Sequence, residues 1–349
     1  MATVVRYVNP GSSGGDGTTS ALSGANAAYA SLSAWEAAEN TNLDTANNIM
    51  QVNCAGSTAD TTAVTISGWT TSATDYIEII GDWAPLTDGK FSTSKYRLNV
   101  QNFTQLTIAN ATAFIRIHNL QIYNSDINTG NIWGILCNST ITSGEIRIYN
   151  NCIRGNNNTS WYDMGIRILG GTATYYIYQN WIYDWGTTAD FNYSAIYFNP
   201  NTIAGGVNCY CENNTFHNNV VGIQRFAGNL IAINNIVKGS GNTYSYVGTF
   251  ATGTDYNSTD STDSIGVGSN NKTSQTFTFV DEANDDFHLA STDTGAKDSG
   301  TSSVNGGFTT DIDGQTRSGT WDIGAHEYQA VGGGLSIPVA MNQYRQRWA

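Results

Sequence analysis

Three segments of the sequence combine carboxylates with tryptophan and tyrosine. They read NSDINTGNIW at 124–133, NNNTSWYDMG at 156–165 and DWGTTADFNYS at 184–194. Carboxyl groups transfer protons, and flat aromatic rings pack against the apolar faces of sugar rings. The residues that carry these groups are Asp126, Asp163, Asp184 and Asp190, together with Trp133, Trp161, Trp185 and Tyr193.

Paired carboxylates are the catalytic groups of most glycosidases, where they act as acid and base or as acid and nucleophile. Asp163 with Asp184 or Asp190 is the pair that these segments favour, and Glu212 is the substitute. The same oxygen ligands would also suit Ca²⁺, the one cofactor that the sequence indicates, although it defines no set of metal ligands. The alternative is that these residues only cap turns and solubilise the surface.

Lyase chemistry would need a different set of groups. A basic residue must remove a proton beside a uronate carboxylate, with a cation to acidify it, and Arg167, Arg225 and Lys238 are available. The low basic content and the formal net charge of −13 make hydrolysis the favoured of the two reactions. Whether the protein is an enzyme at all stays open at this stage.

A repeat sets the positions of these segments. An Asn or Gln interrupts an alternating strand pattern at positions 119, 150, 179, 213 and 234, in steps of 31, 29, 34 and 21 residues. A second strand family begins at Gly134-Ile135, Gly165-Ile166, Ala195-Ile196 and Gly222-Ile223, in steps of 31, 30 and 27 residues. Two families of short strands that share one period indicate a β-solenoid.

The asparagines predict corners between two sheets of the solenoid. In IRIYNNCIRG (146–155), Asn150 and Asn151 break a strand whose apolar residues Ile146 and Ile148 face the core. Asn tolerates the left-handed backbone that a sharp corner requires. Its amide can also bond to the Asn of the next coil, so stacked corners predict an Asn ladder.

The alignment of the repeats predicts columns of outward-facing side chains. They are Arg116, Arg147, Tyr176 and Tyr210; His118, Tyr149, Tyr178 and Glu212; and Tyr123, Arg154, Tyr183, His217 and Lys238. A stripe of Tyr and Arg suits sugar binding, although stacked aromatics also stiffen exposed sheets. The predicted sugar-binding residues are Trp133, Arg147, Tyr149, Trp161, Arg167, Tyr176, Tyr178, Trp185, Tyr193 and His217.

Both ends of the chain depart from the repeat. Ser33 and Glu36 form a capping-box pattern, which predicts a helix over about 33–40 that covers the open end of the solenoid. After Val331-Gly-Gly-Gly334 the chain is apolar and then basic, which favours either docking to a partner or a disordered tail. We therefore expect an opening strand and helical cap over 1–45, a β-helix over 46–328 and a Gly-hinged tail over 329–349.

Together these features resemble the right-handed parallel β-helix proteins of the pectate-lyase-like superfamily, of the secreted or phage-encoded type. The likeness lies in YVNPGSSGGDGT near the start, in the Asn-bearing coils, and in the closing motifs Asp311-Ile-Asp-Gly314 and Asp322-Ile-Gly-Ala-His-Glu327; it covers about 5–328. It implies an all-β, single-stranded right-handed parallel β-helix with a short N-terminal capping helix. Because the superfamily includes lyases, hydrolases, epimerases, tailspikes and adhesins, the resemblance does not select an activity.

Composition limits the class of partner. An acidic chain with a pI of about 4.5 and no basic stripe disfavours nucleic acid, and no apolar run reaches the ~20 residues that cross a bilayer. Five cysteines without zinc-site spacing favour reduced core residues. We expect a carbohydrate-active protein whose partner is a polysaccharide, a neutral one better than a polyanion. The alternative is a non-catalytic structural or adhesive solenoid.

The expected setting is outside the cell or on a virion, although no signal peptide is visible in the sequence. Phage tailspikes of similar type are trimers. The sequence leaves the assembly open between a homotrimer of this type and a virion or surface partner held through the C-terminal tail.

Overall fold

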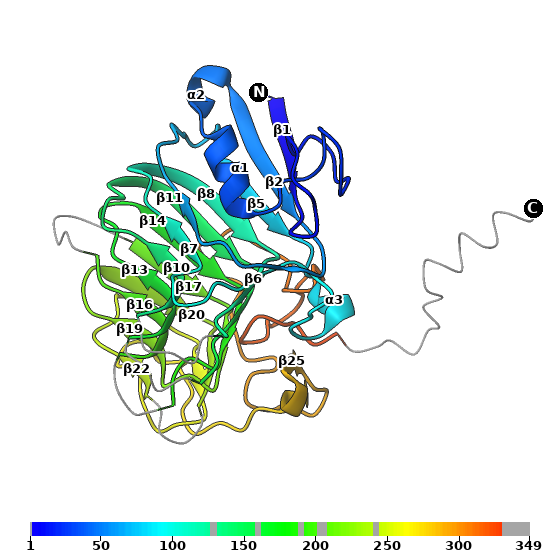
Figure 1. Ribbon diagram of the computed structural model, residues 1–349. Coiled ribbons are helices and arrows are strands. Elements are labelled where there is room, and N and C mark those ends of the chain that lie inside the picture. The colour runs from blue at the N-terminus through cyan, green and yellow to red at the C-terminus, as the bar shows by residue number, and fades with distance from the viewer. Residues whose placement is uncertain are drawn as a thin grey trace, which may run out of the picture.

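The computed structural model describes residues 2–125, 131–157, 162–187, 192–200, 208–239 and 244–329. Successive coils place their strands in three stacked parallel sheets, which makes the chain a parallel β-helix, as expected (Figure 1). Each full coil passes from the first sheet around a corner to the second sheet, through a loop to the third sheet, and by a turn back to the first sheet.

The first sheet has eight strands, in the order β1 (Ala2–Val8), β2 (Asn48–Cys54), β5 (Ile77–Gly81), β8 (Thr112–His118), β11 (Ser143–Tyr149), β14 (Thr174–Tyr178), β17 (Asn208–Glu212) and β20 (Asn229–Ile233). The second sheet also has eight, which are β3 (Ala59–Asp60), β6 (Arg97–Leu98), β9 (Gln121–Tyr123), β12 (Cys152–Arg154), β15 (Trp181–Tyr183), β18 (Thr215–His217), β21 (Ile236–Lys238) and β23 (Ser258–Thr259). The third sheet has seven, which are β4 (Val64–Ile66), β7 (Leu106–Ile108), β10 (Trp133–Cys137), β13 (Met164–Ile168), β16 (Ser194–Phe198), β19 (Val221–Arg225) and β22 (Tyr244–Val247).

The predicted strand register is confirmed residue by residue. Arg147 pairs with Arg116 on one side and with Tyr176 on the other, and Tyr149 lies between His118 and Tyr178 in the same way. Because neighbouring residues of a strand face opposite sides, Ile146 and Ile148 point inward and are fully buried. All five cysteines are free and buried, which confirms that they are core residues rather than disulfides.

Two consecutive residues have different roles at each corner between the first and second sheets. The first residue takes the left-handed conformation, with φ of 53° at Asn150, 56° at Gln179 and 49° at Asn213. The second residue is buried and forms the ladder: the amide of Asn151 donates to Oδ1 of Asn180 at 3.0 Å, and the amide of Asn180 donates to Oδ1 of Asn214 at 3.0 Å. The expected Asn ladder is confirmed, with the strained backbone and the ladder assigned to different residues.

The ladder also satisfies backbone groups in the coil interior. Oδ1 of Asn180 accepts from the N–H of Asn151, while Nδ2 of Asn180 donates to the carbonyls of Ile148 and Tyr178. A buried backbone group without a partner would cost free energy, so these side chains are as much a part of the coil as its strands.

The N-terminal end is covered by helix α1 (Leu32–Glu39) and the short α2 (Leu43–Ala46), which lie at the top of the stack in Figure 1. Leu32 and Trp35 of α1 are fully buried, and the Trp35 ring stacks on that of Trp69 with centroids 5.5 Å apart. The N-cap is Ser31, whose side chain accepts from the N–H of Ala34, and not the predicted Ser33. The capping box fails because Glu36 accepts instead from Trp69 Nε1 and the N–H of Ser67.

Two further short helices are α3 (Pro85–Asp88) and a 3₁₀ helix, η1 (Glu282–Asn284). No helix among the described residues is long and apolar enough to cross a bilayer.

Residues 276–329, here called the closing segment, leave the coil pattern. They contain an antiparallel pair, β24 (Phe279–Asp281) and β25 (Asp286–Leu289), and return from the last coils towards α3 (Figure 1). The N–H of Gly324 donates to the carbonyl of Asn234, and the Asn213 amide donates to that of Gly324. Inside the segment, the buried guanidinium of Arg317 pairs with Glu327 at 3.1 Å.

The ladder yields a stability prediction. Replacing Asn180 by Ala removes the acceptor of the Asn151 N–H and amide and one donor from each of the carbonyls of Ile148 and Tyr178, and we expect the free energy of unfolding to fall by about 2–4 kcal/mol. Denaturant unfolding of the variant measures this loss. The exposed Asn26, replaced in the same way, is the matched control and should change stability by less than about 0.5 kcal/mol. Equal effects of the two substitutions would show that the ladder is not a stabilising element.

Candidate functional site

The closing segment covers the outer side of β17 in the first sheet. Glu212 faces outward, as predicted, but is fully buried beneath this segment. Its Oε1 accepts from the N–H and the amide of Asn305, at 2.7 and 2.8 Å, and its Oε2 accepts from the N–H of Gly306 at 2.7 Å. Burial raises the pKa of Glu212, and these donors partly offset the rise. The carboxylate therefore anchors the closing segment.

The aromatic column of the same sheet is a continuous stack of rings. His118 stacks on Tyr149 at 4.6 Å, Tyr149 on Tyr178 at 4.9 Å, and Tyr178 on Phe308 of the closing segment at 4.6 Å. Both faces of Tyr149 and of Tyr178 are thus occupied by neighbouring rings. For these two predicted sugar-binding residues, the geometry is that of cross-strand stacking.

The next column of the first sheet is only partly covered. The Arg147 guanidinium lies over the Tyr176 ring at 4.5 Å and donates to the carbonyl of Gly306 in the closing segment. The other face of Tyr176 stacks on Tyr210 at 5.1 Å. The edges of these rings remain half-exposed.

The outer column of the second sheet also packs against the closing segment. Arg154 lies between the rings of Tyr123 and Tyr183, and it pairs with Asp285 at 3.3 Å. His217 stacks on Phe287 at 4.6 Å and meets Glu282 at 2.8 Å. Two of the three outer faces therefore serve to hold the closing segment.

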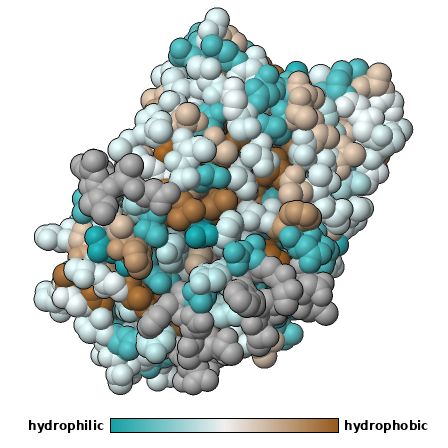
Figure 2. Space-filling view, turned by 60° about the vertical axis from the view of Figure 1, so that its left-hand side comes forward, coloured by the Kyte–Doolittle hydropathy of each residue, from teal (hydrophilic) through white to brown (hydrophobic). Residues whose placement is uncertain are grey.

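The third sheet presents a different surface. The hydrogen bonds, ion pairs and ring contacts that the closing segment makes among the described residues fall on the other two sheets and on itself. Figure 2 brings the side of the molecule with β13, β16 and β19 forward, and it shows apolar and polar side chains intermixed there.

A cluster of Trp133, Arg167 and Tyr197 (the Trp–Arg–Tyr cluster) lies on this third face. The Arg167 guanidinium is 4.3 Å from the centroid of the Trp133 ring and 5.5 Å from that of Tyr197. Burial lowers the pKa of Arg167, and its Nε has no hydrogen-bond partner among the described residues. Indole Nε1 of Trp133 donates to the carbonyl of Tyr162, which fixes the ring plane.

The described loop carboxylates hold local structure. Asp163 is 2% exposed, and its Oδ1 accepts from the N–H of Ile132 at 3.1 Å. Asp184 adopts a φ of 63°, accepts from the amides of Asn157 and Asn218, and lies 3.6 Å from Arg154. Of the remaining loop candidates, Asp126, Trp161 and Asp190 lie outside the described residues. The pairing of these carboxylates for catalysis stays a prediction.

Trp185 and Tyr193 require a correction, because both point into the molecule instead of outward. Trp185 is fully buried, and its Nε1 donates to the carbonyl of Ile153 at 3.3 Å. Its ring occupies space left by Gly134 and Gly165, where an added Cβ would lie 3.4 and 3.2 Å from ring atoms. In the sequence these glycines are visible only as part of the repeat. Their missing side chains are the signal that could have predicted the inward position of the Trp185 ring. Tyr193 is 4% exposed and packs on Val220 and Val221.

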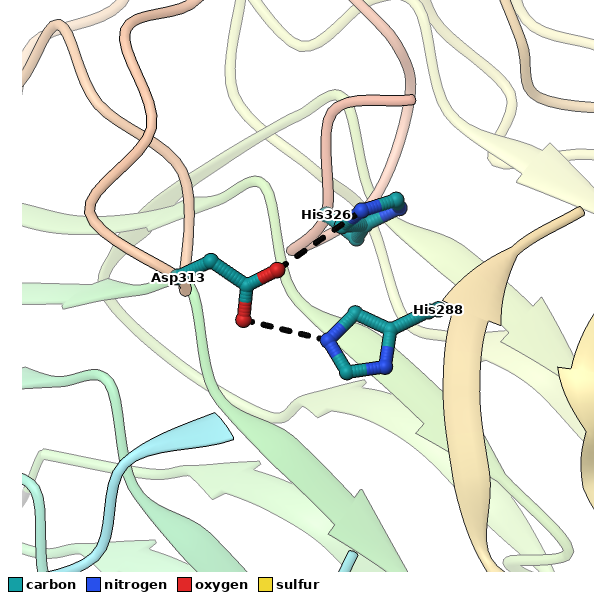
Figure 3. A group of neighbouring side chains, drawn as sticks. All are labelled: His288, Asp313 and His326. Carbon is teal, nitrogen blue, oxygen red and sulfur yellow. Dashed lines mark hydrogen bonds and ion pairs between the residues drawn. The ribbon is translucent and has the colours of Figure 1, made fainter. Parts of the chain in front are cut away.

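One group that the sequence reading left unconnected comes together in the closing segment. His288, Asp313 and His326 form the one cluster of potential metal ligands found among the described residues (Figure 3). Nδ1 of His288 lies 2.5 Å from Asp286, and its Nε2 lies 3.1 Å from Asp313. The sequence does not place the two histidines together, because the strand and the final stretch that carry them follow no repeat. The motifs Asp311-Ile-Asp-Gly314 and Asp322–Glu327 were the signal available.

The two histidines differ in charge. Burial alone would lower the pKa of His288, but hydrogen bonds to Asp286 and Asp313 outweigh it and raise the pKa to about 9. Burial, together with the nearby charges of His288 and Arg317, lowers the pKa of His326 to about 3. At neutral pH the first ring is therefore cationic and the second neutral.

Comparisons with known proteins add one structural likeness. No family model matches the sequence, and no curated protein matches it. Among solved structures, the chain is similar to the crystal structure of pectate lyase Pel9A, over 93% of this chain and 96% of that chain, with a TM-score of 0.35 and 16% sequence identity. The parallel β-helix itself is established by the three parallel sheets of this chain.

The charge on His288 yields a pH prediction. Its folded pKa of about 9 lies above the value of 6.5 for an unperturbed His, so its stabilising contribution is complete below pH 6.5 and is lost as pH rises through 9. We expect this one group to lower the free energy of unfolding by about 3 kcal/mol between pH 6.5 and 9.5.

Unfolding of the wild type and of His288→Gln in metal-free buffer at both pH values tests this expectation. The wild type should lose stability over this range, and His288→Gln should lose clearly less. His118→Gln is the control for the loss of a histidine ring, because His118 lies on the first sheet beside Glu78 and its replacement leaves the bonds of His288 to Asp286 and Asp313 in place. A pH dependence that is the same in His288→Gln and the wild type would contradict the prediction.

Proposed function

We propose that the protein binds a polysaccharide along the outer face of the third sheet. The observation that carries this proposal is the Trp–Arg–Tyr cluster, in which a half-buried guanidinium lies against two aromatic rings on a face that the closing segment leaves open. A rigid aromatic and a preoriented donor on the same surface are what a saccharide needs from a binding site.

The cluster offers both kinds of contact that a sugar makes, which are ring packing and hydrogen bonding. The apolar face of a pyranose packs on an indole or phenol ring, while its hydroxyl groups accept from guanidinium N–H groups. Trp133, Arg167 and Tyr197 come from β10, β13 and β16, which are adjacent strands about 4.8 Å apart. Arg167 is the register partner of Leu136 and Tyr197, and Trp133 lies three residues before Leu136 in its strand. The cluster therefore crosses three adjacent coils at an angle to the stack axis, which suits an extended chain better than a single sugar.

The charge of the protein narrows the class of ligand. With a formal net charge of −13, long-range repulsion opposes a polyanion unless a cation bridges the two. A neutral polysaccharide is the ligand that this proposal favours. An extracellular or virion-surface location goes with such a ligand.

Cleavage is the finer part of the proposal and rests on the carboxylates of the segments that precede strands of the third sheet in the sequence. Asp163 directly precedes β13, and Asp184 and Asp190 belong to the loop that leads to β16. A glycosidase needs two carboxyl groups about 5–9.5 Å apart across the scissile bond. Release of reducing ends from a panel of neutral and acidic polysaccharides, abolished in Asp163→Asn, would assign a cleaving enzyme, and products without a new carbon–carbon double bond would assign hydrolysis instead of elimination. Binding without release would assign the adhesive alternative.

The binding prediction concerns the three cluster residues. Trp133→Ala and Arg167→Ala should each weaken polysaccharide binding by roughly 10- to 100-fold, because each removes a contact surface or donor from the centre of the site. Tyr197→Ala should have a smaller effect, since its ring lies farther from the guanidinium. Affinity electrophoresis against the polysaccharide panel, followed by calorimetry on the best ligand, measures the change.

A matched control exists on the first sheet. Arg116 lies over the Tyr76 ring at 3.7 Å, so Arg116→Ala removes a similar Arg–aromatic contact from a different face. It should bind polysaccharide as the wild type does. Retained binding in all three cluster variants, or equal loss in Arg116→Ala, would remove the third sheet as the binding surface.

A further inference from the structure

The cluster of His288, Asp313 and His326 lies apart from the saccharide face, within the closing segment. His288 belongs to β25, Asp313 to the turn after Asp311, and His326 to the final stretch of the segment (Figure 3). One potential ligand atom from each residue lies within 4.8 Å of the other two. Three parts of the segment that are separate in sequence thus converge on one point.

We propose that this cluster binds a divalent transition-metal ion of the Zn²⁺ class. Ligand bonds of about 2.0–2.2 Å in a tetrahedral site place neighbouring ligand atoms about 3.4 Å apart. Oδ1 of Asp313 lies 3.1 Å from Nε2 of His288, and its Oδ2 lies 3.7 Å from Nε2 of His326, so each oxygen is near that distance from one imidazole. The two imidazoles must close in slightly for both to bind one ion.

The neighbour of His288 supports this assignment. Asp286 lies 2.5 Å from Nδ1 of His288, and it thereby orients the ring with Nε2 toward Asp313. A carboxylate behind the far nitrogen is the usual support of a metal-binding histidine, because it fixes the ring and makes it more basic.

The donor set selects the kind of ion. Two imidazoles and one carboxylate suit Zn²⁺, Co²⁺ or Ni²⁺, whereas Ca²⁺ and Mg²⁺ prefer oxygen ligands alone. The chain has four histidines, and the other two lie on the coils: His118 beside Glu78 and His217 beside Glu282. All five cysteines are buried in the coils, so thiolates do not compete for the ion.

Binding rearranges protons in a defined way. Without the ion, Nδ1 of His326 accepts from the N–H of Leu289 at 3.0 Å, so the neutral ring carries its proton on Nε2. Binding through Nε2 moves that proton to Nδ1 and breaks the bond from Leu289. Nε2 of His288 must likewise be free of any proton that it shares with Asp313 before it can bind the ion.

A cavity beside the cluster accommodates the rest of the coordination shell. Its volume is about 570 Å³, and its lining includes Leu86 of α3, Gln315 and Tyr328 in addition to the three ligands. Water from this cavity fills the remaining coordination position. Because all three ligands belong to the closing segment, the ion fastens the segment in its folded form.

The test uses the untagged full chain, stripped with chelator and then titrated with Zn²⁺ in a calorimeter. We expect one ion per chain, and a rise in Tm of about 4 °C at a free Zn²⁺ concentration near 100 times the Kd. His288→Gln and Asp313→Asn should each weaken binding at least 10-fold and abolish the rise in Tm. His118→Gln is the matched control and should behave as the wild type.

Several results would overturn the proposal: the absence of one-to-one binding, or unchanged binding in both His288→Gln and Asp313→Asn. Should either variant fail to fold by circular dichroism, the Co²⁺ spectrum of the wild type decides. Intense visible bands indicate a four- or five-coordinate site and support the proposal, and the weak spectrum of six-coordinate Co²⁺ contradicts it. Arg167→Ala should bind Zn²⁺ normally, so failure of the saccharide proposal leaves this test intact.

Discussion

The structure depends on the satisfaction of buried backbone groups at the corners of the coils. Asn151, Asn180 and Asn214 each bond to the next Asn of the ladder while donating to carbonyls of the coil interior. A shift of one residue between two coils would break these bonds and turn the apolar side chains outward. The ladder therefore fixes the register, and the register decides which side chains reach the surface.

Local periodicity explains why so much of the fold could be predicted. The columns through Arg147 and Tyr149 follow from the spacing of the asparagines alone, and the left-handed corners at Asn150 and Asn213 follow from residue type. What could not be predicted depends on contacts distant in sequence. Glu212 meets Asn305 and Gly306 across 93 and 94 residues, and Arg147 meets Gly306 across 159. Such contacts have no period, so the covering of two faces left no signal in the repeat.

The three outer faces thus differ in role although their residue types are similar. On the first sheet, both ring faces of Tyr149 and of Tyr178 contact neighbouring rings. On the second sheet, Arg154 and His217 contact the closing segment. On the third sheet, Arg167 has rings around it but no partner for its Nε among the described residues. Residue types alone do not distinguish a stripe of aromatic and Arg residues that is free to bind a ligand from one that only stiffens a sheet. The distinction depends on which outer faces the closing segment covers.

The closing segment also orders the events of folding during synthesis. Strands of neighbouring coils pair across only 21 to 46 residues of sequence, so the coils can stack as the chain leaves the ribosome. The closing segment is made after the coils, and until it folds onto them the carboxylate of Glu212 and the rings beside it face solvent. A nascent chain, or one truncated before residue 276, would therefore be a stack of formed coils with two uncovered outer faces, which could associate with other unfinished copies. Synthesis of residues 276–329 ends that exposure.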